Sequence, residues 1–140
     1  MPIRMIQLIC SICVCCVIGC AQHSRIMGIR LVHFPRINHD NKLWDHKVFG
    51  GDGDADIFIV LSTGNKIVFK GIAYQDVGQN QLPILWNMDV TIERDQLYEI
   101  SVWDEDVLTH ELMGKVAFLG RDITTSLSTP EGIQLEFVFE

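Results

Sequence analysis

The stretch LYEISVWDEDVLTHELMGKVAF, residues 97–118, decides which fold the chain adopts. Its first half places Tyr98, Ile100 and Val102 at every second position, which is the period of a β-strand with one face toward a core. Three consecutive acids follow, and then a second strand-like run, MGKVAFL. The stretch therefore predicts two strands joined by an acidic connection at residues 104–111.

The acids of this connection are spaced so that their carboxylates converge. If the extended backbone continues past Trp103, Asp104 and Asp106 point to one side and Glu105 to the other. Glu111 adds another acid a few residues later. Converging carboxylates repel one another unless a cation lies between them. We therefore expect a cation at the end of this strand.

The rest of the chain repeats the strand signature, with β-branched and aromatic residues in short runs. The further runs are GIRLVHF (28–34), DIFIVLS (56–62), KIVFK (66–70), IAYQDV (72–77), MDVTIE (88–93) and IQLEFVF (133–139). Turn-forming sequences such as STGN and STPEG separate them. Residues 121–128 are compatible with a short helix or a loop. Eight strands so spaced predict an all-β fold, an antiparallel β-sandwich of two sheets. Trp103, between apolar strand neighbours, is expected to be largely buried.

Composition limits the classes of function. The 140 residues are enough for one folded domain, and the net charge of −7 excludes the basic face that nucleic-acid binding needs. The four histidines after residue 28, at 33, 39, 46 and 110, are scattered, and neither a nucleophile elbow nor a glycine-rich phosphate loop occurs. The sequence therefore predicts a binding module and not an enzyme.

The N-terminus has the features of an export signal. All five cysteines lie within the first twenty residues, where Arg4 precedes an apolar run that is too short for a comfortable membrane span. The run ends in Val-Ile-Gly-Cys at residues 17–20, which resembles the lipobox of bacterial lipoproteins. A plain export signal or a short anchor helix is the alternative interpretation.

The lipobox resemblance implies a division of the chain. Residues 1–19 would be the signal peptide, and Cys20 would carry lipid such as palmitate on its thiol. Residues 20–27 would form a tether and residues 28–140 the domain. Loss of Arg4 would leave ten basic against eighteen acidic residues, a net charge of −8. Alanine after the cysteine resembles the pattern for the outer membrane of a bacterial cell envelope.

A second group of acids precedes the strand that starts near Ile57. Its members are Asp45, Asp52, Asp54 and Asp56. Loops at one end of a sandwich come together in space, so this group and the connection at 104–111 are expected to form one cup. Calcium takes six to eight oxygen ligands at about 2.3–2.6 Å, and residues 28–140 contain neither a cysteine nor clustered imidazoles that would favour a transition metal. The expected metal is therefore Ca²⁺.

Three segments together resemble the C2 domain, the calcium- and phospholipid-binding β-sandwich. They are DADIFIVL (54–61), LPILWNMDVTI (82–92) and LYEISVWDEDVLTHELMGKVAF (97–118). The resemblance covers residues 54–118 well and 28–53 loosely. It implies that the calcium ligands are Asp45, Asp56, Asp104, Asp106 and Glu111, with Asp52 as the alternative to Asp45.

The sequence also departs from the C2 pattern. Ile57 and Phe58 replace a Pro-Tyr pair, and Leu85 replaces the proline before the tryptophan. The acidic connection is one residue shorter and closes with Glu111 in place of aspartate. Aspartates at loop tips also serve as solvated turn residues in sandwiches that bind no metal.

Two functions follow from these patterns. The first is an exported, lipid-anchored, calcium-binding C2-like module that contacts a membrane through phospholipid headgroups or lipopolysaccharide. The alternative is a metal-independent scaffold that binds a protein of the cell envelope. In both, the membrane is reached through the lipid on Cys20, and nucleic acid is not a partner.

Overall fold

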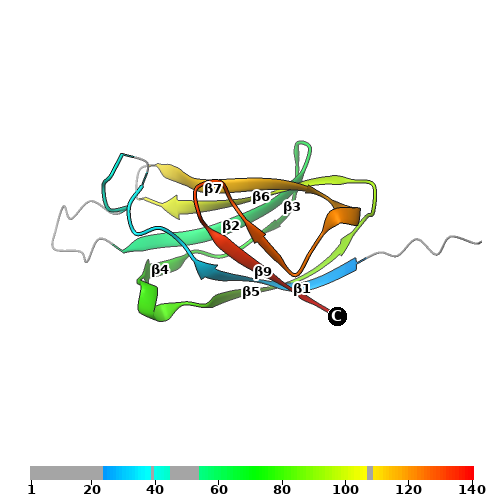
Figure 1. The fold of residues 1–140 in the computed structure, drawn as a ribbon, viewed down its shortest axis with the longest axis horizontal. Helices are drawn as coiled ribbons and strands as arrows, with labels where there is room; N and C mark the ends of the chain where they lie inside the picture. Colours follow the sequence, from blue (N-terminus) through cyan, green and yellow to red (C-terminus); the bar gives the residue numbers. More distant parts are fainter. Residues whose placement is uncertain (1–23, 39, 45–53, 107–108) are drawn as a thin grey trace, which may run out of the picture.

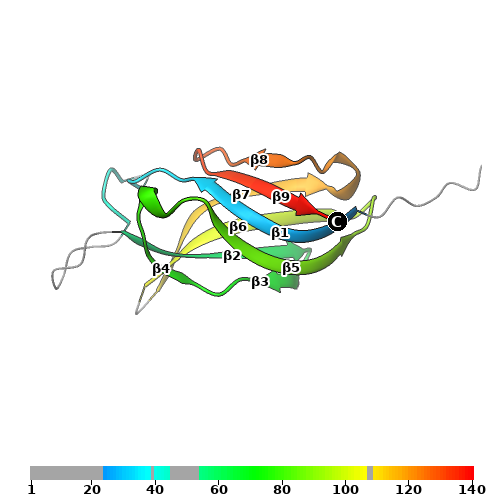
Figure 2. The same cartoon turned by 90° about the horizontal axis from the view of Figure 1, so that it is seen from below.

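The computed structural model describes residues 24–38, 40–44, 54–106 and 109–140. In this part, nine strands and two short 3-10 turns pack as two layers (Figures 1 and 2). The strands are β1 (Ser24–His33), β2 (Ala55–Thr63), β3 (Lys66–Lys70), β4 (Tyr74–Val77), β5 (Ile84–Ile92), β6 (Leu97–Glu105), β7 (His110–Leu119), β8 (Ser126–Ser128) and β9 (Gln134–Phe139), and the turns are η1 (Gln79–Gln81) and η2 (Gly120–Asp122). None of the helices found in these ranges is long and apolar enough to cross a membrane.

The strands form two antiparallel sheets. One sheet has the order β5-β1-β9-β8 and the other the order β3-β2-β6-β7. β4 also pairs with β2, at residues 55–57, whereas β3 pairs with it at residues 60–63. β3 and β4 therefore act as one edge strand that is interrupted between Lys70 and Tyr74. Figure 2 shows the two sheets as front and back layers.

The predicted fold class, an all-β antiparallel sandwich, is confirmed. Each predicted run contains a strand, and the ninth strand arises because Ser126–Ser128 pairs with β9 in the segment left open as helix or loop. β1 begins at Ser24, four residues before the predicted start, since Ile26 is fully buried in the core. The connection between β6 and β7 is also tighter than predicted, because β6 continues through Glu105 and β7 begins at His110.

The core lies between the two sheets. Tyr98, Ile100 and Val102 all point into it, so the alternation in residues 97–102 is read correctly from the sequence. β2 contributes Ile57, Ile59 and Leu61 from the same sheet, and the facing sheet contributes Ile26, Ile29, Leu31, Ile92 and Leu135. These apolar side chains supply most of the hydrophobic free energy that holds the sheets together.

The expectation that Trp103 is largely buried is only partly correct. Its side chain is half-buried, because the two-residue period puts it on the face opposite to Val102. There its ring stacks against Phe58, with 6.4 Å between centroids, and its Nε1 donates a hydrogen bond to Ser101 Oγ at 2.9 Å. Phe58 itself is buried, under Trp103 and the Lys70 ammonium, which lies 4.8 Å from its ring.

Trp86 on β5 fastens the two sheets at one edge. Its side chain is 3% exposed, and its Nε1 donates a hydrogen bond to Ile72 O at 2.8 Å across the interruption between β3 and β4. Tyr74 packs edge-on against the Trp86 ring at 5.2 Å and donates its own hydrogen bond to Leu85 O. Gly71 makes room for the ring, since a Cβ at this position would clash with Trp86 Cδ1.

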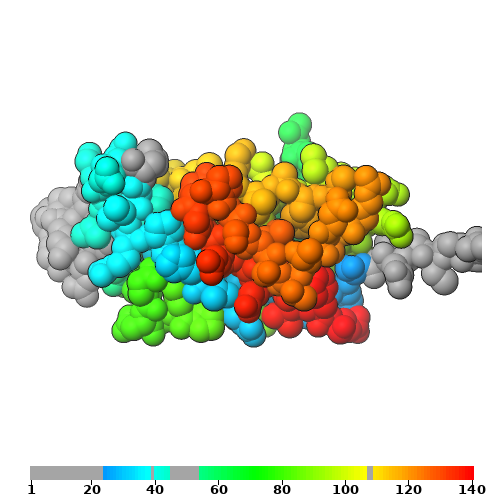
Figure 3. All heavy atoms as spheres, in the orientation of Figure 1, coloured from blue at the N-terminus to red at the C-terminus, as the bar shows by residue number. Residues whose placement is uncertain are grey.

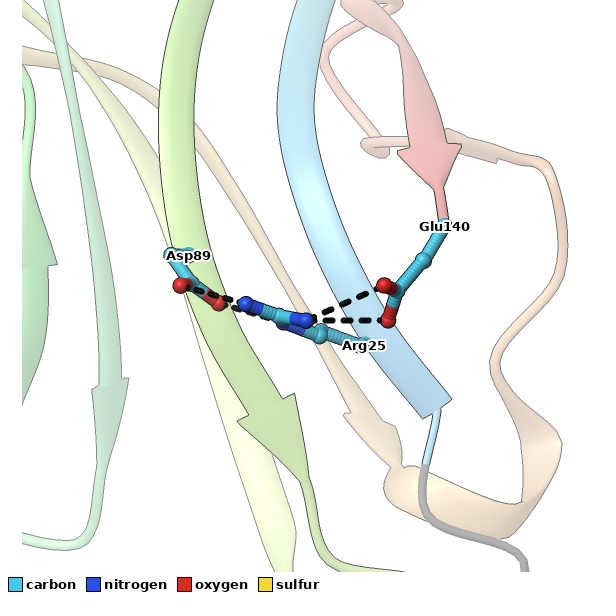
Figure 4. Close-up of polar contacts among 3 residues, drawn as sticks. All are labelled: Arg25, Asp89 and Glu140. Carbon is cyan, nitrogen blue, oxygen red and sulfur yellow. Dashed lines mark hydrogen bonds and ion pairs between the residues drawn. The ribbon is translucent and has the colours of Figure 1, made fainter.

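Arg25 joins three elements at the start of β1 (Figure 4). Its Nε and Nη2 donate to Asp89 on β5, both at 2.7 Å, and its Nη1 donates to Glu140, after β9, at 3.1 Å. The Arg25 guanidinium lowers the pKa of Asp89 below its ordinary value of 3.8, and the two carboxylates raise the pKa of Arg25. The contribution of this pair to stability is therefore present above pH 3.8 and is lost as the pH falls through the lowered pKa.

We predict unequal costs for removing the two tryptophan side chains of β5 and β6. Trp86→Ala empties a buried site and deletes a hydrogen bond to the backbone, so it should cost about 3–5 kcal/mol of unfolding free energy. Trp103→Ala should cost clearly less, because that ring is partly in solvent. Urea unfolding of both variants measures the difference, and equal losses would contradict the role given to Trp86.

Candidate functional site

The candidate site is one end of the sandwich, on the left in Figure 1. We call it the acidic end and define it by six carboxylate residues on the loops and strand ends there. They are Asp54, Asp56, Asp76, Asp104, Asp106 and Glu111. Strand pairing and three hydrogen bonds connect four of these residues to one another or to the loop after β1. The four are Asp56, Asp76, Asp104 and Glu111. The expectation that distant acidic segments meet at one end therefore holds for these residues.

Asp104 belongs to β6 and not to a loop. It pairs with Ile57 on one side and with Glu111 on the other, and its side chain is fully buried on the face that carries Ile100 and Val102. Asp104 Oδ1 accepts a hydrogen bond from the Asp56 backbone N at 2.8 Å. The acid that the sequence places at a loop tip thus lies at the edge of the core and fixes the start of β2.

Asp56 extends this connection to β4. Its Oδ1 accepts a hydrogen bond from the Asp76 backbone N at 2.7 Å. Asp76 has a φ of 53°, in the left-handed region that aspartate tolerates better than most residues. The sequence analysis missed Asp76 because it lies inside an apparent strand run, although the Asp-Val-Gly that follows Gln75 is a signal of a strand end.

Glu111 is held by the loop after β1. Its Oε1 accepts a hydrogen bond from Asn38 Nδ2 at 3.3 Å, and Asn38 is itself buried. Asn38 Oδ1 accepts from the backbone N of Asp40 at 3.0 Å and of Lys42 at 3.1 Å, which closes the loop into a turn. The sequence analysis also did not identify Asn38 as part of the site. The only sequence signal for it is the number of turn-forming residues around it.

Asp106 forms the turn between β6 and β7. Its backbone N donates to Thr109 O at 2.9 Å, and its side chain is half-buried. Asp104 and Asp106 therefore differ in environment, since the first lies within the sheet and the second lies on the hairpin connection.

The acidic end is rich in carboxylates that have no basic partner in the part of the chain that the structure describes. The structure has five salt bridges among the described residues. Their acids lie away from the acidic end and are Asp89, Glu140, Glu136, Glu99 and Asp95. None of these salt bridges involves Asp54, Asp56, Asp76, Asp106 or Glu111. These charges repel one another, so a cation that approached this end would be attracted to it.

The donor chemistry fits calcium, but the described carboxylates do not make up a site by themselves. Over residues 24–38, 40–44, 54–106 and 109–140, no three Asp, Glu, His or Cys side chains converge closely enough to hold an ion. Asp56, Asp104 and Glu111 each use one oxygen on an N–H donor of the protein. The predicted ligand Asp45 and its alternative Asp52 lie outside the described residues, as does Cys20.

Comparisons with known proteins bear on the fold. No protein-family model matches the sequence, and no curated protein matches it. Solved structures do match: a structure described as that of a C2 domain has a TM-score of 0.54 and 15% identity, over 82% of this chain and 93% of that one. A C2 domain of plant extended synaptotagmin 1 has a TM-score of 0.55 and 16% identity, over 86% of this chain and 95% of that one.

The chain has the fold of a C2 domain. Human GIVD cytosolic phospholipase A2 also matches, with a TM-score of 0.53 and 17% identity, but the match spans only 17% of that enzyme. Identities this low establish the fold and not the function of the chain. The C2-like architecture predicted from residues 54–118 is thus confirmed, and it extends over β1 and β9 as well.

We predict that, in the absence of calcium, the hydrogen bond accepted by Asp104 Oδ1 contributes more to the stability of the protein than the negative charge of Asp104 does. Asp104→Asn keeps an acceptor for the Asp56 N–H, so stability in chelator should equal or slightly exceed that of the wild type, because one repelling charge is gone. Asp104→Ala leaves a buried N–H without its acceptor and should cost about 1–3 kcal/mol. Urea unfolding in chelator compares the two, and equal losses would argue against this hydrogen bond as the main role of Asp104.

Proposed function

We propose that the chain is an exported, lipid-anchored module of the C2 fold whose acidic end binds calcium and, with it, the phosphate groups of phospholipid headgroups. The observation that carries the proposal is the acidic end itself: five carboxylates there have no basic partner among the described residues, and the buried Asp104 of β6 is linked to two of them, Asp56 and Glu111, by a hydrogen bond and by strand pairing. The proposal assigns no catalysis to the chain. In its support, the two C2 domains matched above are covered almost completely by the alignment.

The proposed calcium ligands are those expected from the sequence. Asp56, Asp104, Asp106 and Glu111 would contribute carboxylate oxygens, with Asp45 as a further ligand. Bound calcium would neutralise these charges and leave coordination positions for phosphate oxygens. The sandwich holds these carboxylates in place at one end. The Asp56 backbone N–H donates to Asp104, and the Asp76 backbone N–H donates to Asp56.

One observation favours the second candidate function, a metal-independent scaffold for an envelope protein. The oxygens of Asp56, Asp104 and Glu111 that accept hydrogen bonds already serve to order loops and strand ends. Carboxylates used in this way stabilise a sandwich without any ion. The two functions differ in one measurable property, which is the response of the folded chain to calcium.

We predict that millimolar calcium stabilises the protein. A dissociation constant of about 10⁻⁴–10⁻³ M, typical of extracellular calcium modules, gives about 1–2 kcal/mol at a few millimolar calcium. The melting temperature should therefore rise by about 2–8 °C relative to chelator. Asp106→Asn should abolish the rise, whereas Asp122→Asn, an exposed aspartate on η2 at the opposite end, should leave it unchanged.

A folded wild-type protein that melts at the same temperature in calcium and in chelator would exclude the calcium function and favour the scaffold. A loss of the response in both Asp→Asn variants would indicate a general charge effect and not a site at the acidic end.

We also propose that the chain is cleaved before Cys20 and that lipid on its thiol holds it in the bacterial envelope, at the outer membrane. The support is the Val-Ile-Gly-Cys ending of the apolar N-terminal run. Cys20→Ser should then accumulate as an unprocessed precursor, visible as a slower band on a gel, while Cys16→Ser should be processed normally. Normal processing and membrane partitioning of Cys20→Ser would exclude a lipoprotein.

A further inference from the structure

We propose that a pocket beside the acidic end binds a small organic amine, with a positively charged ammonium group on an apolar body. The pocket lies between the loop after β1 and the turn between β8 and β9, and it has a volume of about 200 Å³. Its lining residues are Pro35, Ile37, Asn38, Trp44, Met113 and Glu131. None of the proposed calcium ligands among the described residues belongs to this lining, so the inference does not rest on calcium or phospholipid binding.

The pocket leads from the surface toward the core. Trp44 and Met113 are buried and form its inner part, whereas Ile37 and Glu131 are exposed and lie at its mouth. Figure 3 shows the two walls side by side on the viewed face, with the cyan loop of residues 34–44 next to the orange-red turn after β8. A bound molecule would therefore contact apolar side chains at depth and the Glu131 carboxylate near the solvent.

The wall formed by the loop after β1 is ordered by its own hydrogen bonds. Trp44 Nε1 donates to Pro35 O at 2.7 Å, and the Asn38 backbone N donates to Lys42 O at 2.8 Å. The Asn38 side chain accepts two further backbone N–H groups and donates to Glu111. This wall is thus formed before any ligand arrives, and the amide oxygen of Asn38 is already in use.

The opposite wall is the turn of residues 129–132. Gly132 N donates to Thr129 O at 3.0 Å, and Ile133 N donates to the Thr129 hydroxyl oxygen at 3.3 Å. Thr129 is itself buried. Glu131 is the third residue of this closed turn, so its backbone is held in place. Because both walls are ordered in advance, a ligand would not have to order a loop when it binds.

The missing side chain at Gly114 of β7 lets the Glu131 carboxylate lie against the strand. A Cβ at Gly114 would be too close to Glu131 Oε2, at 2.7 Å, and to the Thr129 hydroxyl oxygen, at 2.8 Å. Gly114 directly follows Met113, so the carboxylate lies beside the inner part of the pocket. None of the salt bridges among the described residues involves Glu131. Its negative charge is therefore available to a cationic ligand.

The charges around the pocket favour a cation over an anion. Among the described residues that line it, only Glu131 is charged. The same loop carries exposed Arg36 and Lys42, but Arg36 lines a separate small cavity together with Asp54, and Lys42 lines neither cavity. Glu111 lies behind Asn38, at the far end of their hydrogen bond, and adds to the negative potential. An ammonium group at Glu131 would form a charge-assisted hydrogen bond.

The remaining lining requires that the cation carry an apolar body. Pro35, Ile37, Trp44 and Met113 offer no charged group, and the Ile37 side chain is 47% exposed although it borders the two buried ones. A ligand that covers these side chains removes apolar surface from water, and an indole ring also attracts an organic cation. A bare metal ion would gain nothing from this surface, and a neutral apolar molecule would leave Glu131 unmatched.

The test is a titration of the isotopically labelled full chain with phenethylammonium, followed by nuclear magnetic resonance at the Trp44 indole N–H and the Gly132 amide. Phenethyl alcohol has the same apolar body without the charge, and hydrocinnamate has it with a negative charge. The first variant is Glu131→Gln, which keeps the size of the side chain. Its matched control is Glu93→Gln, an exposed acid directly after β5. Both substitutions are at exposed positions, so the fold should persist, and the dispersion of the amide signals verifies it.

Phenethylammonium should shift both signals to saturation, phenethyl alcohol should bind about tenfold more weakly, and hydrocinnamate more weakly still. Glu131→Gln should weaken phenethylammonium about tenfold and leave phenethyl alcohol unchanged, whereas Glu93→Gln should change neither. Equal affinities for the amine and the alcohol would overturn the inference, because the pocket would then be merely apolar. Equal losses in the two variants, or no saturable shift at Trp44, would overturn it as well.

Discussion

The Trp86 ring, buried where the two sheets meet at one edge, is the contact on which the arrangement of the sandwich depends. It comes from β5 of one sheet, and its N–H bonds the carbonyl of Ile72 at the interruption of the β3–β4 edge strand in the other. Gly71 leaves the space that the ring fills. Because β4 pairs with β2 just beyond the interruption, the same contact positions Asp76 next to Asp56. Core packing and site geometry are thus coupled through one side chain.

At the acidic end, three carboxylates accept hydrogen bonds that order strand ends and a loop, which limits the oxygens available for other ligands. The buried Asp104 anchors the start of β2, Asp56 anchors the end of β4, and Glu111 is bonded to the loop after β1. A cation would therefore be bound by groups that are already oriented, so that little conformational entropy would be lost. The same preorganisation serves a protein partner equally well, which is why calcium dependence separates the two proposed functions.

The ends of the sandwich differ in chemistry. One end carries carboxylates without basic partners among the described residues, whereas at the other end Arg25 pairs with Asp89 and Glu140, and Arg121 pairs with Asp95. Arg25 holds the first residues of β1 in the sheet on both sides, through Asp89 on β5 and Glu140 after β9.

The fold class could be predicted from the sequence, because the alternation in β6 and the β-branched runs indicate strands that bury one face. The sequence also predicted that Asp56 and the acids of residues 104–111 lie at the same end, since loops of a sandwich meet there, and the hydrogen bond between Asp56 N and Asp104 agrees with this. It did not determine the exposure of Trp103, which depends on the face opposite to its apolar neighbours. Nor did it place Asp104 in a strand, because the length of the hairpin turn depends on backbone pairing with β7. Asn38 and Asp76 were identified only by the tertiary structure, since their roles are hydrogen bonds across 73 and 20 residues of chain that no local pattern encodes.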